Sequence, residues 1–231
     1  MPSLLYVALE NMVWISTQTA REWGRYWAAP WWYKLRGALA WAWLGSSPNL
    51  AIARYWRRTH PDEPLRGGLP EDCGDLTYGE LLPGAACQLL EWAQLKAGER
   101  VVDLGCGRGI LPLVAALAYA LPALGVDIIG EYVDRGERAA KLMGVEKLCQ
   151  FQVLDFCQGP LPSGALYFIP ATCLSEESYR ALVAQLGAVS APGQKFFSLS
   201  RPLPFKKWSA PQVREIPCTW GPARVYYQYR L

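Results

Sequence analysis

The sequence is poor in the residues that build metal centres and disulfide frameworks. It contains one histidine, His60, which cannot form a metal site alone, and seven cysteines, an odd number without a CxxC pair. The first residues carry no Lys or Arg, and Glu10 interrupts their short apolar run, so we recognise no secretory leader. These absences predict a cytoplasmic protein with reduced thiols and no bound metal ion.

The sequence also lacks an uninterrupted apolar run long enough to cross a bilayer. The nearest candidate, residues 37–53, is uncharged up to Ala53 but contains Ser46-Ser47-Pro48-Asn49 in its middle. A spanning helix would bury these polar groups in lipid and would break at the proline. We therefore expect no transmembrane segment.

Positive charge and tryptophan are concentrated at the N-terminus. Residues 1–60 hold seven Lys/Arg and two Glu, and eight of the eleven Trp precede residue 57. We expect a helical segment over residues 1–58, broken at Pro30 and at Ser46–Pro48, and a linker over residues 59–76. The segment is either a helical cap on the following domain or an element that docks on a membrane surface or a partner, which would make the protein peripheral to a membrane. RNA binding by stacked aromatics is a third option. The contacts in the docking interpretation would be Arg25, Trp27, Trp31, Trp32, Lys34 and Arg36.

From about Thr77 the chain alternates short apolar runs with amphipathic stretches. This alternation predicts an α/β fold, in which right-handed crossovers build a doubly wound, mostly parallel sheet. Five strands and a closing hairpin indicate seven strands with an antiparallel edge. We expect helices at 83–95, 110–119, 131–143 and from Ser175 to Gly187, and strands at 100–104, 124–128, 151–154, 166–169, 195–199, 213–218 and 224–229.

A glycine loop follows the first of these strands, in Val101-Val102-Asp103-Leu104-Gly105-Cys106-Gly107-Arg108-Gly109. Glycines between a strand and a helix let the backbone approach a ligand, and the helix N-terminus offers unpaired N–H groups. The spacing is GxGxG rather than the GxGxxG of dinucleotide-binding proteins. With Asp103 two residues before the first glycine, it fits a ligand without pyrophosphate but with a cationic amino-acid group, such as S-adenosylmethionine (SAM). A tight turn without a ligand is the alternative.

Two further acids follow the next two strands. Asp127 ends the segment Leu124-Gly125-Val126-Asp127, where a carboxylate can accept hydrogen bonds from both ribose hydroxyls of a nucleoside. Asp155 ends the third strand, where it could accept from an adenine amino group while Phe156 covers the ring. Either acid could instead cap a helix or be solvated, but acids at three successive strand ends predict a nucleoside site at this edge of the sheet.

Residues 77–231 resemble the class I SAM-dependent methyltransferases, and several stretches resemble the non-SET histone- and protein-lysine methyltransferases of the disruptor-of-telomeric-silencing type. The resemblance implies a cofactor, SAM, and a protein lysine as the methyl acceptor. It also implies that a Tyr78-Gly79-Glu80 loop folds over the cofactor, with Glu80 near its ribose or methionine moiety. A solvated loop residue is the alternative for Glu80. The matching stretches are Tyr78-Gly79-Glu80, Asp155-Phe156, Ala171-Thr172-Cys173-Leu174 followed by Ser175-Glu176-Glu177, Pro192-Gly193 and Thr219-Trp220-Gly221.

One departure from this family concerns catalysis. Where such relatives carry an asparagine after the fourth strand, this chain has Ile169-Pro170-Ala171, and it lacks an Asn/Asp-Pro-Pro-Tyr motif. A methyltransferase for RNA or a small molecule, or an inactive SAM-binding module, is therefore the alternative to a lysine methyltransferase. Methyl transfer needs orientation and exclusion of water more than a general base. We expect an apolar acceptor channel, lined by Tyr78, Tyr167, Phe168 and Thr172 unless these are core residues, with Cys106 and Cys173 as packing residues.

Overall fold

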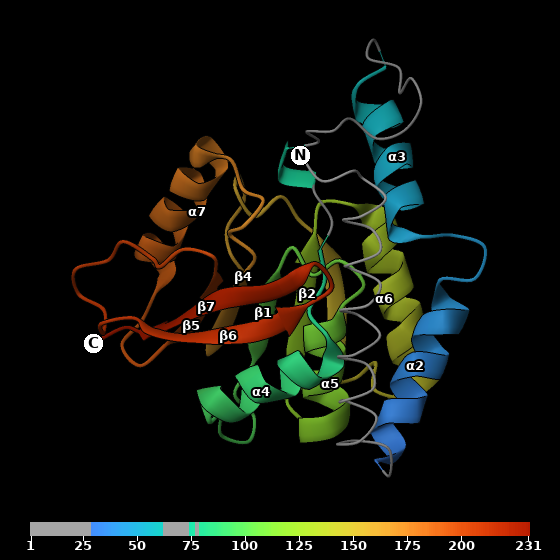
Figure 1. The fold of residues 1–231 in the computed structure, drawn as a ribbon, viewed down its shortest axis with the longest axis horizontal. Coiled ribbons are helices and arrows are strands. Elements are labelled where there is room, and N and C mark those ends of the chain that lie inside the picture. Colours follow the sequence, from blue (N-terminus) through green and yellow to red (C-terminus); the bar gives the residue numbers. More distant parts are fainter. Residues whose placement is uncertain (1–28, 62–73, 77–78) are drawn as a thin grey trace.

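The computed structural model describes residues 29–61, 74–76 and 79–231. Tyr78, Arg25 and Trp27, all predicted to make contacts, lie outside these residues, as does most of the predicted linker. Figure 1 shows the described chain as a central sheet with helices on both faces and two N-terminal helices along one side. The α/β fold with an N-terminal helical segment is thus confirmed.

The sheet has seven strands in the order β3-β2-β1-β4-β5-β7-β6. Neighbours from β3 to β5 run parallel, and β7 is antiparallel to both β5 and β6. The chain order reverses between β1 and β4, so the loops after these strands diverge and leave a crevice at the carboxyl edge. The strands are β1 (Val101–Leu104), β2 (Ala123–Asp127), β3 (Cys149–Val153), β4 (Leu166–Ile169), β5 (Lys195–Leu199), β6 (Gln212–Cys218) and β7 (Gly221–Tyr229).

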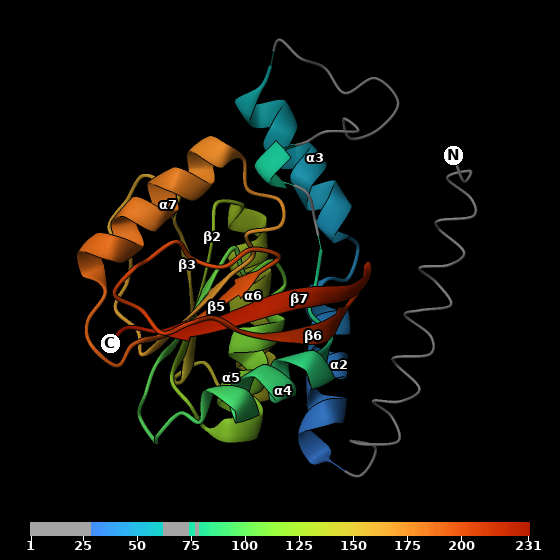
Figure 2. The same cartoon turned by 60° about the vertical axis from the view of Figure 1, so that its left-hand side comes forward.

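The two faces of the sheet are covered unequally, as Figures 1 and 2 show. Helices α4 (Pro83–Ala93), α5 (Ile110–Tyr119) and α6 (Gly130–Met143) cover one face and form the larger hydrophobic core with it. The other face packs against α7 (Glu176–Val189) and against the loops that follow β3 and β5. Every side chain of β1 is buried because the strand has core on both faces.

Most predicted elements agree with the structure to within two residues, but strand β7 begins at Gly221, three residues before its predicted start. Two smaller differences have clear reasons. Strand β3 begins at Cys149 and ends at Val153, so Asp155 lies in the loop after the strand rather than at its last position. Helix α7 continues past Gly187 to Val189. Gly187 is a packing residue and not a helix end, because a Cβ at this position would lie 3.0 Å from the Phe205 ring.

The described part of the N-terminal segment forms helices α2 (Pro30–Ala42) and α3 (Pro48–Thr59), which lie beside α6 (Figures 1 and 2). Each begins with a proline at its first turn, where the missing N–H costs nothing, and the Ser47 side chain accepts a hydrogen bond from Leu50 N to cap α3.

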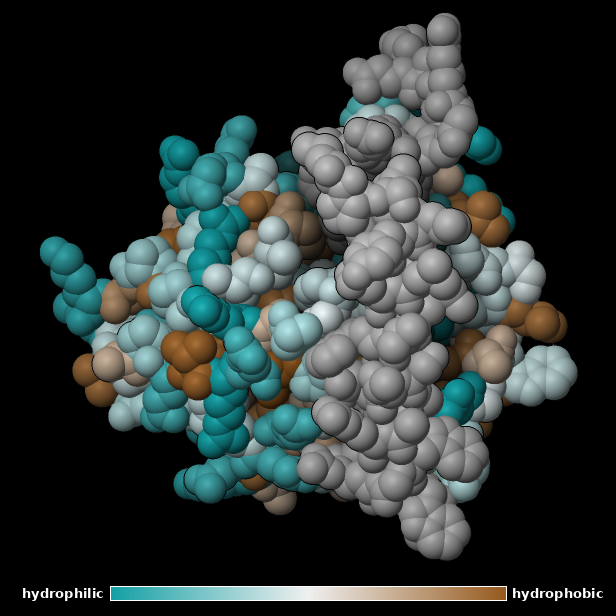
Figure 3. All heavy atoms as spheres, in the orientation of Figure 1, coloured by the Kyte–Doolittle hydropathy of each residue, from teal (hydrophilic) through white to brown (hydrophobic). Residues whose placement is uncertain are grey.

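The helices correct the predicted set of docking residues. Trp32 is only 2% exposed, which leaves little of its side chain for contact with a membrane or a partner, and Trp31 is partly buried. Trp41 points outward instead and is 67% exposed. Figure 3 shows hydrophobic and hydrophilic residues mixed along the edge where α2 and α3 lie. Within the described residues, no helix combines the length and apolar character needed to span a membrane.

Candidate functional site

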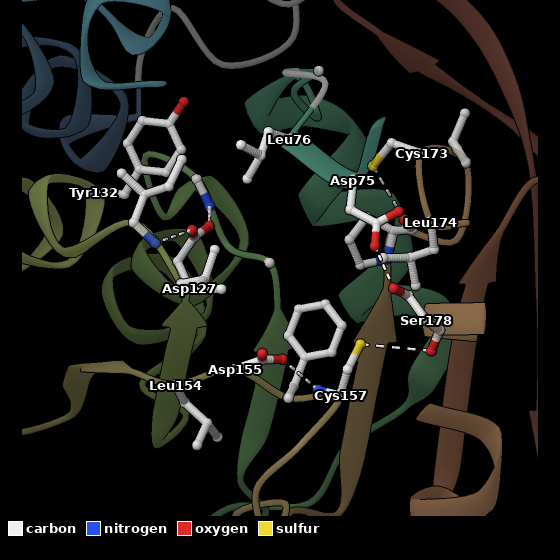
Figure 4. A pocket seen from close by; sticks show the side chains of 18 of the residues that line it. Asp75, Leu76, Asp127, Tyr132, Leu154, Asp155, Cys157, Cys173, Leu174 and Ser178 are labelled. Carbon is white, nitrogen blue, oxygen red and sulfur yellow. Dashed lines mark hydrogen bonds between the residues drawn. The ribbon is translucent and has the colours of Figure 1, made fainter. Parts of the chain in front are cut away.

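A cavity of about 390 Å³ opens at the carboxyl edge of the sheet, where the strand order reverses. Its size suits a nucleoside-sized ligand, and its lining is mostly apolar with a few polar groups. Figure 4 shows that side chains from the end of β2, from the loop after β3, from α6 and from the start of α7 lie around this space. The walls come from the glycine loop, the segments after β2, β3 and β4, the end of β5, residues 75–76, Gly79 and the β6–β7 turn.

Gly105 and Gly107 of the glycine loop line the cavity, whereas Gly109 lies outside its described wall. Gly105, Gly107 and Gly109 have φ values of +77°, +53° and +79°, in the left-handed region that side chains disfavour. Gly109 also precedes the first residue of α5, and a Cβ there would lie 2.5 Å from the ring of Phe151. The same ring would meet a Cβ on Gly125 at 2.8 Å and on Gly136 at 2.5 Å. One phenyl ring thus fills a slot between the loop, β2 and α6.

Asp127, the last residue of β2, is buried in the cavity wall beside this loop. Its Oδ2 accepts a hydrogen bond from Gly107 N and its Oδ1 accepts one from Ile129 N, both at 2.9 Å. Burial raises the pKa of Asp127 to about 6, although these backbone hydrogen bonds favour the charged form. Each oxygen keeps a further lone pair, so the carboxylate can accept two more hydrogen bonds from a ligand.

Asp103, in β1, is buried within the sheet. Burial, and then the charge of Asp127, raise the pKa of Asp103 to about 8. The described wall of the cavity does not include Asp103, so its influence on a ligand is electrostatic or through water. A cation bound above the loop would relieve the repulsion between the two carboxylates.

The loop after β3 supplies the stretch of cavity wall beside Asp127, and Leu154 N donates a hydrogen bond to Asp127 O at 3.0 Å. Asp155 Oδ1 accepts a hydrogen bond from Cys157 N at 2.9 Å, which fixes the carboxylate in a short turn (Figure 4). Phe156 packs near the glycine loop, 3.6 Å from where a Cβ on Gly105 would lie. Both predicted residues, Asp155 and Phe156, therefore line the cavity.

The segment Gly79-Glu80 lies on the turn between β6 and β7, 140 residues away in the sequence. Glu80 N donates to Thr219 Oγ1 at 3.1 Å, and Thr219 N donates to Glu80 O at 2.9 Å. Gly79 lies so close to Trp220 that a Cβ would approach the indole to 2.3 Å. Two stretches that resemble one family in sequence are thus in direct contact, and together they close one end of the cavity.

The carboxylate of Glu80 has a different partner from the predicted one. It is buried, neither solvated nor part of the described cavity wall, and it accepts hydrogen bonds from Arg108 Nε at 2.7 Å and Arg108 Nη2 at 2.5 Å. This two-point ion pair ties the Gly79-Glu80 segment to the glycine loop. Glu80 thus holds the two walls together.

The wall after β4 and β5 separates the core residues from the cavity residues among the candidates for the acceptor channel. Tyr167 and Phe168 are core residues, because each is at most 4% exposed and the Tyr167 hydroxyl donates to Pro162 O. Thr172 does line the cavity, and its Oγ1 lies 2.7 Å from Ser200 Oγ. Ser200 has φ +72°, a conformation that costs a non-glycine residue about 1 kcal/mol or more.

Residues around Pro170 complete this wall. Pro170 packs over the glycine loop, with its Cγ 3.1 Å from where a Cβ on Gly105 would lie. Arg201 holds the segment in place by donating to Ala171 O at 3.2 Å and to Leu174 O at 2.7 Å. Cys173 also borders the cavity, whereas Cys106 is buried and its pKa is raised by burial, as expected for a packing residue.

Sequence reasoning missed several lining residues. Asp75 and Leu76 lie in the predicted linker, yet both reach the cavity, and Asp75 accepts hydrogen bonds from Ser175 N and from the Ser178 hydroxyl at the start of α7 (Figure 4). Tyr132 also lines the cavity from the first turn of α6. No local pattern marks these positions. Among the residues that the structure describes, no cluster of His, Cys, Asp or Glu could hold a metal ion.

Comparison with known proteins relates this edge of the sheet to a methyltransferase family. Residues 85–165 match the family model of ribosomal protein L11 methyltransferase (PrmA). The chain is 30% identical to the ribosomal protein L11 methyltransferase of Bordetella bronchiseptica over 158 residues, which cover 64% of this chain and 48% of that protein. It is 32% identical to the cycloartenol-C-24-methyltransferase of Arabidopsis thaliana over 106 residues, 44% of this chain and 31% of that one. The chain spans less than half the length of either relative.

Solved structures share the fold at lower sequence identity. TrmN from Thermus thermophilus superposes with a TM-score of 0.58 at 23% identity, covering 65% of this chain and 49% of that chain. An RNA methyltransferase from Salinibacter ruber, solved with S-adenosyl-L-homocysteine, gives a TM-score of 0.53 at 21% identity, covering 62% of this chain and 88% of that chain.

Proposed function

We propose that this chain, a member of the class I SAM-dependent methyltransferases, binds SAM at the carboxyl edge of its sheet and transfers the methyl group to a nucleophile. The observation that carries the proposal is the joint placement of the glycine loop, Asp127 and Asp155 around one cavity of suitable size. The sequence matches of residues 85–165 cover the same elements.

The side chains present fit the parts of SAM. Asp127 would accept from the ribose hydroxyls, and Asp155 would accept from the adenine amino group beside Phe156. Asp103 would attract the ammonium of the methionine moiety, directly or through water, above the left-handed glycine backbone. The cavity thus offers carboxylate acceptors toward the ribose hydroxyls and the adenine amino group, and an apolar surface toward the rings of SAM.

The transferred methyl group comes from the sulfonium of the cofactor, and the protein's part is to orient the acceptor and exclude water. Trp220 and Leu199 give the acceptor end an apolar surface, and Thr172 provides a hydroxyl there. A neutral nucleophile with a free lone pair is favoured in such surroundings, since a charged one would have to be desolvated. Thr172 and Tyr78 are the residues that we assign to acceptor positioning.

We propose a protein lysine as the acceptor. An apolar entrance lowers the pKa of an amine and so releases the lone pair that attacks the methyl group. By name, the relatives act on different acceptors, a ribosomal protein, cycloartenol and RNA, and a methyltransferase for RNA or a small molecule is the rival. A second rival, a SAM-binding module without activity, is favoured by Pro170 in the place of the asparagine that resembling lysine methyltransferases carry.

Calorimetric titration of the full chain with SAM and with NAD tests the cofactor proposal. We expect micromolar binding of SAM and none of NAD. Asp127→Ala should weaken SAM binding about tenfold or more, about 1.4 kcal/mol, since the ribose contacts are lost. Asp134→Ala, an exposed acid on α6, is the matched control and should leave binding unchanged. If SAM does not bind to the native chain, the cofactor proposal fails.

Methyl-labelled SAM with a protein extract and with an RNA extract then separates the acceptor proposals. Label in protein that is recovered as methyllysine supports the lysine acceptor, and label in RNA supports the rival. If neither is labelled although SAM binds, the Pro170→Asn variant decides between the remaining options. Activity that appears only in this variant would identify the native chain as an inactive binding module.

A further inference from the structure

The N-terminal helices hold the first turn of α6 through a compact polar cluster. Glu131 Oε1 accepts a hydrogen bond from Ser46 Oγ at 2.7 Å, and Arg54 Nη1 donates to both Glu131 oxygens at 2.8 Å. Burial opposes the charge of Glu131, but the hydrogen bonds from Arg54 and Ser46 still hold the pKa of its carboxyl below the ordinary value. Two residues from the segment before the domain thus meet one acid of the domain.

The residue next to Glu131 is part of the cavity wall and is also held by the N-terminal segment. The Tyr132 hydroxyl donates to Pro48 O at 3.2 Å, and its ring lies 5.6 Å from that of Trp43, centre to centre. Arg135, one turn further along α6, donates to Ala42 O and lies over the same indole. Side chains at 131, 132 and 135 therefore all have partners between Ala42 and Arg54.

This same turn of α6 fixes the carboxylate that we assign to the ribose. Ile129, which precedes the first residue of α6, donates its backbone N–H to Asp127 Oδ1. Tyr55, the neighbour of Arg54 on α3, is close enough to Asp127 and Asp155 for their charges to act on its hydroxyl. Burial, and then the charge of Asp155, raise the pKa of Tyr55, and Asp127 adds to this rise.

We propose that α2 and α3 help to position the residues at the nucleoside end of the cofactor site. Ser46 and Arg54 act as positioning residues, because they fix Glu131 and hence the turn that carries Tyr132 and the N–H bonded to Asp127. SAM binding and the docking of these two helices are therefore coupled, so that whatever displaces the helices lowers cofactor affinity. This inference rests on the proposed binding of SAM.

Affinity for SAM in variants of the full chain tests the coupling. Arg54→Ala should raise the Kd for SAM about fivefold, a typical coupling between sites, while Arg54→Lys should recover part of the loss. Arg57→Ala is the matched control, because Arg57 is an exposed arginine one turn along α3. Glu131→Ala should raise the Kd as much as Arg54→Ala does, and the double variant should be no weaker than either single variant.

Hydrogen exchange of the ligand-free protein supplies an independent readout. Arg54→Ala should speed exchange of the amides of Ile129 and Tyr132 relative to Arg57→Ala, even without cofactor. Unchanged Kd in Arg54→Ala, in a protein whose native form binds SAM, would overturn the coupling and leave the ion pair as packing only. Failure of the native chain to bind SAM is a different result, since it removes the cofactor proposal itself and this inference with it.

Discussion

The half of the sheet from β1 to β3 and the half from β4 to β7 build their sides of the cavity in different ways. In the first half, polar groups sit at or just after strand ends and bond to nearby backbone, as Asp127 does to Gly107 and Ile129. In the second half, the wall joins residues far apart in the chain, such as Thr172 with Ser200 and Gly79 with Trp220. The proposed cofactor end therefore has a short local signature, whereas the proposed acceptor end depends on tertiary contacts.

The sharpest way to break the first half is to add one methyl group to its loop. Gly109→Ala should destabilise the protein by about 2–4 kcal/mol, because the new Cβ meets the Phe151 ring in an unfavourable φ region. Chemical denaturation measures the change. Gly144→Ala is the control. Gly144 also has a positive φ, +73°, but a Cβ there would have no atom within 4 Å, so the substitution should cost only about 1 kcal/mol. Equal effects would show that the slot for Phe151 imposes no packing constraint.

Removing the hydroxyl pair tests the second half. Thr172→Val and Ser200→Ala should each lower kcat about tenfold, about 1.4 kcal/mol, without changing the Kd for SAM, because the pair borders the acceptor end. Steady-state kinetics on the labelled acceptor and calorimetry provide the two readouts. Ser163→Ala, exposed before β4, should change neither. A loss of SAM affinity in Thr172→Val would contradict the proposal that the two halves of the sheet serve different ends of the site.

The buried acids of the first half predict a pH dependence. The pKa of Asp103 is raised from 3.8 to about 8 and that of Asp127 to about 6. At pH values between the unfolded and the folded pKa, the native state therefore binds more protons than the unfolded chain. Stability of the ligand-free protein should therefore fall as pH rises from about 4 to about 8. Asp103→Asn should make the melting temperature fall by about 2–4 °C less than in the native chain over this pH range. Asp134→Asn serves as the exposed control, and an unchanged slope in Asp103→Asn would contradict the assignment.

The smallest effect is expected where the predicted linker meets the second half. Asp75→Asn keeps the shape of the side chain but removes its charge from the start of α7, where an acid is stabilising. The loss should be about 0.5 kcal/mol, measurable by denaturation. Glu177→Gln in the first turn of the same helix is the comparison. A larger loss there than at position 75 would mean that the contact with residues 74–76 adds nothing to the helix.

The elements with strong local patterns could be predicted from the sequence. Helix α5 and strands β4 and β5 have the predicted bounds, because each is a compact apolar stretch with a clear turn on both sides. The acids at 127 and 155 could be found because strand order alone brings them to one edge. Their roles toward a cofactor remain predictions.

Contacts between distant segments could not be predicted in this way. Glu80 stands in a recognisable stretch, but nothing local shows that Arg108 occupies its carboxylate. Tyr167 and Phe168 have the same aromatic character as channel residues, and only the packing on both faces of β4 buries them. Asp75 has no neighbouring pattern, since its partners Ser175 and Ser178 lie a hundred residues further along.

The ring of Phe151 has a consequence for anyone who wishes to transplant this glycine loop. Gly109, Gly125 and Gly136 each leave space for the same phenyl group. Their small size is therefore required by a side chain on β3 as much as by a ligand. The set of residues that must be transferred together is therefore larger than the loop. A graft into another scaffold must carry Phe151 and the two facing glycines, Gly125 and Gly136.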